Sequence, residues 1–208
     1  MVRWLNLKIF HGYHMLIAGV DEVGRGPWAG PVLAAAVILD PEHPIEGLRD
    51  SKVLSSKKRT FFCEIIKSSA LSWAIGSASV EEIDRFNILQ ATLMAMQRAI
   101  DGLAIKPDRI KVDGKILPKI NASMEAIVDG DVTVPAISAA SIVAKVTRDL
   151  LMIKYDSGYP GYGFGKHKGY GTAEHFDAIR RLGITPIHRR SFSPIKKFLS
   201  AGNIFQKN

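Results

Sequence analysis

A single cysteine is all that the 208-residue chain contains. Cys63 has no second thiol with which to form an internal disulfide, which excludes the disulfide-stapled scaffolds of small secreted proteins and favours a reducing compartment. We therefore expect a cytoplasmic protein. The neighbours of this thiol are apolar, among them Phe61, Phe62, Ile65 and Ile66, so it is expected to be buried and structural and not a nucleophile.

Long apolar runs are missing as well. The longest, residues 29–39, contains Gly30 and Pro31 and falls well short of the roughly 18 residues that a membrane helix needs. Residues 1–14 make a poor signal peptide because Arg3, Lys8 and two histidines interrupt their apolar residues. We expect them to be an N-terminal extension of one domain, residues 15–208, with no membrane partner and nothing that demands more than a monomer.

Acidic residues are scarce in the second half of the chain. Residues 1–104 carry 11 Lys and Arg against 11 Asp and Glu, whereas residues 105–208 carry 17 against 9, which accounts for the whole net charge of +8. A one-sided basic surface suits a polyanion such as nucleic acid. A basic surface that only aids solubility is the alternative.

The apolar pattern predicts alternating strands and helices. Strands are expected at residues 16–20, 32–39, 71–78, 109–112 and 126–128. Helices are expected at residues 56–69, along the face formed by Leu89, Leu93, Met96 and Ile100, from Pro135 to Gly158, and near residues 173–182 and 194–201.

This order predicts an α/β fold with a five-stranded mixed sheet flanked by helices. Strands two and three can pair antiparallel through short links, whereas the later strands need helical crossovers, so part of the sheet should be parallel. A helical C-terminal part is expected from about residue 172.

Four acidic residues stand where the predicted strands end. Asp21 and Glu22 follow the first strand, Asp113 follows the fourth, and Asp131 lies just beyond the fifth. Strand ends at a sheet edge form a crevice, and several carboxylates in one crevice would take up protons unless a cation compensates their charge. Hard oxygen ligands without nearby Cys or paired His favour Mg²⁺ or Mn²⁺, and two such ions roughly 4 Å apart can activate a water and stabilise the leaving oxygen of a phosphodiester.

Two other aspartates compete with Asp131 for the fourth place. Asp129 lies two residues before it and points to the same side of an extended backbone. Asp149 lies at the edge of the apolar face of the helix after Pro135, where it could face the site or pair with an arginine. For any one of these acids, capping a helix or binding a lysine is the ordinary role.

Several motifs resemble type 2 ribonuclease H (ribonuclease HII). The first is GVDEVGRGPWAGP at residues 19–31, and the others follow in the family's order across residues 16 to about 198. They are Asp50-Ser51-Lys52, Asp113-Gly114, the run from Pro135 to Asp149 that contains Lys145 and Arg148, residues 167–172, and His188-Arg189. The triplet Gly24-Arg25-Gly26 differs from the glycine–lysine–glycine expected of the sister type 3 enzymes.

The resemblance implies a ribonuclease H-like fold and Mg²⁺- or Mn²⁺-dependent cleavage of RNA in RNA–DNA hybrids. It also implies incision on the 5′ side of a single ribonucleotide in duplex DNA, which leaves a 3′-hydroxyl and a 5′-phosphate and serves ribonucleotide excision repair. The implied partners are therefore RNA–DNA hybrids and ribonucleotide-containing duplex DNA.

The same resemblance assigns roles to individual residues. Asp21, Glu22, Asp113 and Asp131 would be the catalytic, metal-binding carboxylates, and the glycine before Asp131 and its 18-residue step from Asp113 rank it above its two rivals. The residues that would contact the substrate are Gly24, Arg25 and Gly26 at the ribose 2′-hydroxyl, Tyr170 at that hydroxyl and the next sugar, and Lys52 at a backbone phosphate.

Two other functions remain open from the sequence. A non-catalytic nucleic-acid-binding domain would explain the basic half of the chain but leaves the clustered acids unexplained. Another nuclease or recombinase of the same fold would explain the acids but predicts no preference for ribonucleotides.

Overall fold

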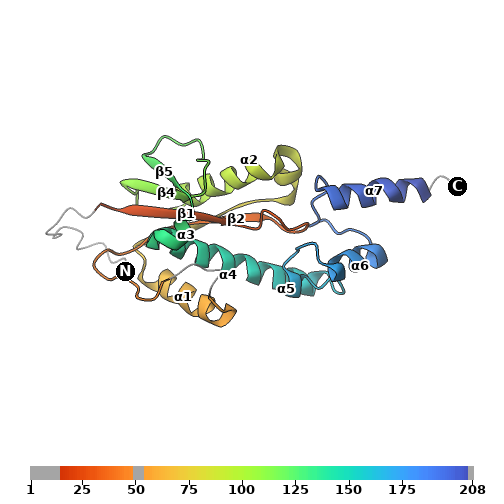
Figure 1. Ribbon diagram of the computed structural model, residues 1–208, viewed down its shortest axis with the longest axis horizontal. Helices are drawn as coiled ribbons and strands as arrows, with labels where there is room; N and C mark the ends of the chain where they lie inside the picture. The colour runs from red at the N-terminus through yellow and green to blue at the C-terminus, as the bar shows by residue number, and fades with distance from the viewer. Residues whose placement is uncertain (1–14, 49–53, 206–208) are drawn as a thin grey trace, which may run out of the picture.

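The computed structural model describes residues 15–48 and 54–205, with side chains through residue 200, and forms a five-stranded sheet between two helical layers (Figure 1). The strands lie side by side in the order β3-β2-β1-β4-β5, and the first three pair antiparallel. Strand β4 pairs parallel with both β1 and β5. The bounds are Ile17–Val23 for β1, Val32–Ile38 for β2, Ser72–Ala78 for β3, Arg109–Asp113 for β4 and Met124–Ile127 for β5. The predicted mixed sheet is confirmed.

Different helices cover the two faces of the sheet. Helix α2 (Val80–Asp101) covers one face, whereas α1 (Ser56–Ser69) and α4 (Pro135–Gly158) lie on the other (Figure 1). Side chains alternate between these faces along each strand. Ala18 and Val20 of β1 therefore pack with α2, and Ala35 and Val37 of β2 pack with α1 and α4.

Local signals set where the helices begin. Ser55 caps α1 by accepting a hydrogen bond from the Lys58 amide, and Ser79 and Glu82 form a reciprocal capping box at the start of α2. Pro135 occupies the first turn of α4, where its missing amide hydrogen costs nothing.

The C-terminal part is helical, as expected. Helices α5 (Phe164–His167), α6 (Ala173–Leu182) and α7 (Ser193–Phe205) follow α4, and α6 and α7 lie at one end of the elongated molecule (Figure 1). A third apolar cluster, separate from the two beside the sheet, holds this part together. No helix within the described ranges is long and apolar enough to cross a membrane.

Three expectations need correction. Strand β1 does not end before the acids but continues through Asp21 and Glu22 to Val23. No helix connects β4 to the parallel β5, because the ten residues 114–123 form an irregular loop instead of the predicted helical crossover. Helix α2 begins nine residues before the predicted apolar face at Leu89, and Asn87 interrupts it with a left-handed backbone (φ 68°).

Candidate active site

One cavity of about 540 Å³ collects most of the predicted site residues. Three of the four candidate carboxylates line it, together with the glycine-rich turn after β1 and the loop after α5. The lining residues are Asp21, Glu22, Val23, Gly24, Arg25, Gly26, Arg59, Asp113, Ser141, Lys145 and Tyr170. No histidine or cysteine is among the described residues of this lining, so its possible metal ligands are oxygen atoms.

The two acids of β1 point to opposite faces of the sheet. Val20 packs toward α2, so Glu22 lies on the α2 face and borders a second, smaller cavity formed with that helix. Asp21 lies on the α4 face, where the Ser141 hydroxyl hydrogen-bonds to its carboxylate. The strand end therefore carries two adjacent carboxylates that approach the cavity from different sides.

Strand β4 brings Asp113 next to Asp21. Val20 and Val112 are paired in the parallel register of β1 and β4, and each aspartate follows one of these valines. Both aspartates thus occupy the same face of neighbouring strands. The predicted convergence of these two acids follows from the register of the sheet alone.

This proximity changes the acidity of both acids on β1. Burial, with added repulsion from Glu22 and Asp113, raises the pKa of Asp21 from 3.8 to about 8. Burial and the charge of Asp113 also raise the pKa of Glu22, whereas its 3.4 Å ion pair with Arg25 opposes that rise. The cavity therefore disfavours several negative charges unless a cation balances them.

Asp131 does not line the cavity, although the residue before it contacts Asp113. It is in the first turn of the short helix α3 (Gly130–Thr133), with a buried side chain, and its carbonyl accepts a hydrogen bond from the Ser138 hydroxyl. The preceding Gly130 amide donates to Asp113 Oδ1 at 2.8 Å, which anchors this turn over the end of β4. Its rival Asp129 is exposed and has a left-handed backbone (φ 54°).

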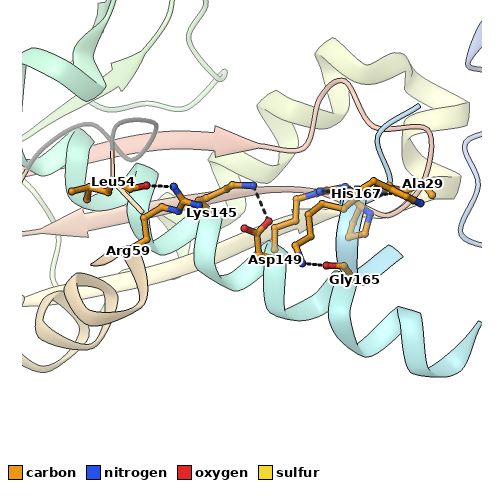
Figure 2. A network of polar contacts seen from close by, with 11 residues as sticks. Ala29, Leu54, Arg59, Lys145, Asp149, Gly165 and His167 are labelled. Carbon is orange, nitrogen blue, oxygen red and sulfur yellow. Dashed lines mark hydrogen bonds and ion pairs between the residues drawn. The ribbon is translucent and has the colours of Figure 1, made fainter. Parts of the chain in front are cut away.

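The other rival, Asp149, is engaged elsewhere. Lys145 Nζ forms an ion pair with Asp149 Oδ1 at 2.8 Å one helical turn away, as Figure 2 shows. The partner is a lysine, not the arginine that the sequence suggested. The lysine lines the cavity and the aspartate does not, so the pair holds a positive charge at the cavity's edge.

Within the described ranges, no group of three or more Asp, Glu, His or Cys side chains is arranged as the ligands of one metal ion would be. The carboxylates share a cavity without forming a closed ligand shell. Their fitness for a metal ion therefore rests on their charge, their burial and the raised pKa of Asp21.

Two buried arginines hold the glycine-rich turn in place. Arg189 donates to the carbonyl oxygens of Gly24, Arg25 and Gly30 at 2.6–2.9 Å, and burial together with the charge of Arg148 lowers its pKa to about 9. Gly24 has φ +93°, and a side chain there would collide with the Arg148 guanidinium. Only glycine therefore fits at this point of the turn.

Arg148 also joins this turn to the loop that carries Tyr170. It donates to the carbonyl oxygens of Ala29 and Pro31 on one side and of Lys168 on the other, at 2.9–3.2 Å. Tyr170 is 45% exposed, and its ring edge lies close to Gly26, since Cε1 would be 3.5 Å from a methyl group built on that glycine. The structure thus brings together the turn and the tyrosine that the resemblance assigns to ribose recognition, whereas Lys52 lies outside the described residues.

Three polar lining residues were not among the predicted site residues. Ser141 and Lys145 lie four residues apart on α4 and face the cavity, and Arg59 reaches it from α1 while donating to the Leu54 carbonyl (Figure 2). Ser141 and Lys145 stand four residues apart in the largely apolar first half of α4, which was a detectable signal. Nothing in the sequence marked Arg59.

Comparison with known proteins agrees with this geometry. The family model for ribonuclease HII matches residues 18–195. A ribonuclease HII of Coxiella burnetii is 60% identical over 184 residues, which covers 88% of this chain and 91% of the relative. The crystal structure of ribonuclease H2 from Pyrococcus horikoshii OT3 superposes with a TM-score of 0.75 at 29% identity, covering 93% of this chain and all of the other.

A more distant structure shares the fold alone. The crystal structure of Bst-RNase HIII in complex with Mn²⁺ has a TM-score of 0.70 at 19% identity, covering 91% of this chain and 71% of that protein. The expected ribonuclease H-like fold is confirmed. The chain belongs to the ribonuclease HII family and is a ribonuclease H endonuclease that acts on RNA–DNA hybrids.

Proposed function

We propose that the chain cuts the phosphodiester on the 5′ side of a ribonucleotide in duplex nucleic acid, using Asp21, Glu22, Asp113 and Asp131 as ligands of two divalent ions. The products would carry a 3′-hydroxyl and a 5′-phosphate, and the role would be ribonucleotide excision repair. The observation that carries the proposal is one cavity in which the buried Asp21 and the partly buried Glu22 and Asp113 meet the glycine-rich turn and Tyr170.

The carboxylates fit hard divalent ions such as Mg²⁺ or Mn²⁺. Their oxygen atoms are the donors that these ions prefer, and the raised pKa of Asp21 marks a place where positive charge would be stabilising. When bound, the ions supply the charge that activates the attacking water and stabilises the leaving oxygen. The Mn²⁺ complex of Bst-RNase HIII supports a metal of this class, although that protein shares only the fold.

The glycine-rich turn supplies the surface against which the ribose would lie. Gly26 leaves its backbone exposed, and the carbonyls of Gly24 and Arg25 are already fixed by Arg189. A backbone without side chains can approach a sugar closely, and the 2′-hydroxyl is the group that separates RNA from DNA. Tyr170, whose ring lies beside Gly26, would contact this hydroxyl and stack on the next sugar.

Basic side chains at the cavity would hold the phosphates. Arg25, Arg59 and Lys145 line it, and each can donate to a phosphate oxygen. Their charges would also offset the repulsion between the carboxylates and an approaching polyanion. The chain's own acids and bases would thus divide the cavity into a metal side and a phosphate side.

A cleavage assay on three labelled duplexes tests the proposal: all-DNA, DNA with one ribonucleotide, and a full RNA–DNA hybrid. With Mg²⁺ or Mn²⁺, the duplex with one ribonucleotide should be cut once, 5′ of the ribonucleotide, and the full hybrid should be cut at many positions. The all-DNA duplex should not be cut. Chelation of the metal should stop both reactions. Cutting of all-DNA duplex at a comparable rate would instead support a nuclease without ribose selection, and binding without cutting would refute the enzymatic assignment.

A further inference from the structure

Three histidines outside the acidic site form a buried cluster behind the Tyr170 loop. His175 and His188 are 0% and 1% exposed, and their Nε2 atoms lie 3.0 Å apart. The ring of His167 stacks on that of His175 with centroids 4.5 Å apart. None of the three lines the described cavity, so any influence they have on the reaction is indirect.

The hydrogen bonds around the cluster fix the tautomers of His175 and His188. His175 Nδ1 lies 2.9 Å from the Tyr170 carbonyl oxygen, which can only accept, so Nδ1 carries the proton and Nε2 is bare. His188 Nδ1 accepts from the Thr185 amide at 2.8 Å, so its proton is on Nε2. The contact between the two rings is then a hydrogen bond that His188 donates and His175 accepts.

These bonds form a directed chain that ends at the backbone of Tyr170. It runs from the Thr185 amide through His188 and His175 to the Tyr170 carbonyl, which also accepts from the Thr172 amide at 2.9 Å. Two donors of fixed direction thus hold one carbonyl, and its peptide plane cannot rotate without breaking one of them.

The amide side of the same loop is also fixed by a histidine. His167 donates from Nε2 to the Tyr162 carbonyl at 2.8 Å and accepts from the Gly169 amide at Nδ1. Lys168 and Gly169 both have left-handed backbones, with φ of 54° and 82°, so this loop needs outside support to keep its shape. The exposed Tyr170 ring therefore stands on a backbone that histidines hold from both sides.

We propose that His175 is a positioning residue for ribonucleotide recognition, because it sets the backbone angle at which Tyr170 meets the sugar, and that His188 keeps the His175 proton on Nδ1. This inference rests on the proposed role of Tyr170. Burial lowers the pKa of both rings to about 4, so they stay neutral at physiological pH and the chain keeps one direction. A neutral chain is needed because two imidazolium rings would both donate and their mutual contact would be lost.

Two amide substitutions separate the bonds of His175. In His175→Asn, the side-chain nitrogen takes the place of Nδ1 and can still donate to Tyr170, whereas the link to His188 is lost. In His175→Gln, the amide reaches the place of Nε2 and keeps the link to His188, whereas the donor to Tyr170 is lost. Replacing the exposed His43, which pairs with Asp40 on the surface, by Asn and by Gln gives a matched control.

The readout is kcat/KM on duplex DNA with one ribonucleotide. His175→Gln should lose about tenfold, the size expected for one hydrogen bond to a backbone carbonyl, and His175→Asn should stay within about twofold. In a Tyr170→Ala background, His175→Gln should cause no further loss because its target is gone. Equal losses for both amides, or an undiminished loss in the Tyr170→Ala background, would overturn the positioning role.

Two further measurements keep the outcomes distinct. If Tyr170→Ala alone cuts at the wild-type rate, the proposed role of Tyr170 fails, whatever the histidines do. If His175→Gln does not fold, ¹⁵N NMR of the unmodified protein decides, since the chain requires an Nδ1-protonated His175 and an Nε2-protonated His188. The opposite tautomers, or a charged ring at neutral pH, would refute the chain directly.

Discussion

Gly19 of β1 lies directly against the backbone of Ala136 at the start of α4. A methyl group built on Gly19 would come within 2.0 Å of the Ala136 carbonyl carbon and 2.2 Å of the Ile137 amide nitrogen. Because the obstacle is backbone, no side-chain rotation can relieve it. This contact sets the depth at which α4 packs on the sheet, and with it the distance between Asp21 on β1 and Ser141 on α4.

The first prediction concerns this contact. Gly19→Ala should lower the free energy of unfolding by about 3 kcal/mol or more, because α4 must move off the sheet. Gly158→Ala at the end of the same helix meets nothing within 4 Å and should change stability by less than about 1 kcal/mol. Urea unfolding of both variants measures the difference, and equal effects would show that α4 tolerates the shift.

The second prediction separates cleavage from folding at Asp113. In Asp113→Asn the side-chain carbonyl can still accept from the Gly130 amide, so the turn before Asp131 should survive. Loss of the negative charge should nevertheless slow cleavage by about 10³-fold or more, while duplex binding in an anisotropy titration changes little. Asp129→Asn, at the exposed aspartate two residues before Asp131, is the control and should cut normally. A normal cleavage rate for Asp113→Asn would show that Asp113 is not a metal ligand.

The third prediction follows from the raised pKa of Asp21. The folded, metal-free protein keeps this proton up to about pH 8, whereas the unfolded chain loses it near 3.8. The unfolded state therefore binds fewer protons between these values, and Asp21 lowers stability as the pH rises. Asp21→Asn should raise the stability of the metal-free protein at pH 8 by up to about 5 kcal/mol and have little effect at pH 4.

Metal provides the contrasting condition for that variant. Mg²⁺ should raise the melting temperature of the wild type at pH 8, because it replaces the proton, but should do so much less for Asp21→Asn. Equal stabilisation of both proteins by Mg²⁺ would mean that Asp21 does not hold the ion.

Much of the fold could be predicted because local signals and tertiary packing agree. Pro135 at its start and the stop signal Gly158-Tyr159-Pro160 at its end placed α4 correctly. The early part of α2 was missed because Asn87 breaks the helical period, so the residues before it do not share the stripe that begins near Leu89. The missing crossover between β4 and β5 was unpredictable from length alone, since ten residues are close to the shortest span for a parallel connection.

The site, too, could be predicted from the sequence only in part. Strand-end acids and glycines are visible in a sequence because their types are unusual at those places. Which acids converge depends on register, which pairs Val20 with Val112 and is invisible locally. The full burial of Arg148 and Arg189 could not be predicted either. Their partners are backbone carbonyls, and every residue has one, so the sequence does not show which carbonyls an arginine will bind.

The fourth prediction tests the buried Arg189. Its guanidinium serves three carbonyls at once, and a lysine ammonium cannot reproduce that planar fork. Arg189→Lys should therefore cost about 3–5 kcal/mol of stability and loosen the glycine-rich turn, although the charge is kept. Arg190→Lys at the adjacent exposed position should be nearly neutral, and thermal unfolding of the pair measures the contrast. A fully stable Arg189→Lys would show that charge, not geometry, matters there.

The fifth prediction is an acid-dependent loss of stability caused by the histidine cluster. The pKa of His175 and of His188 is about 4 in the folded protein, where burial disfavours their charged forms, against 6.5 when the chain is unfolded. Between these values the unfolded state binds more protons, so stability falls as the pH drops from 6.5 towards 4, by up to about 3 kcal/mol for each ring. The His175→Asn variant should take up about one proton fewer on unfolding at pH 5, a difference given by the slopes of unfolding free energy against pH.

The direction of the pKa shift distinguishes this cluster from the exposed His43, whose pairing with Asp40 raises its pKa and so stabilises the fold on acidification. An identical slope for wild type and His175→Asn would mean that the ring already carries its proton in the folded state, and the directed chain to Tyr170 could not then exist.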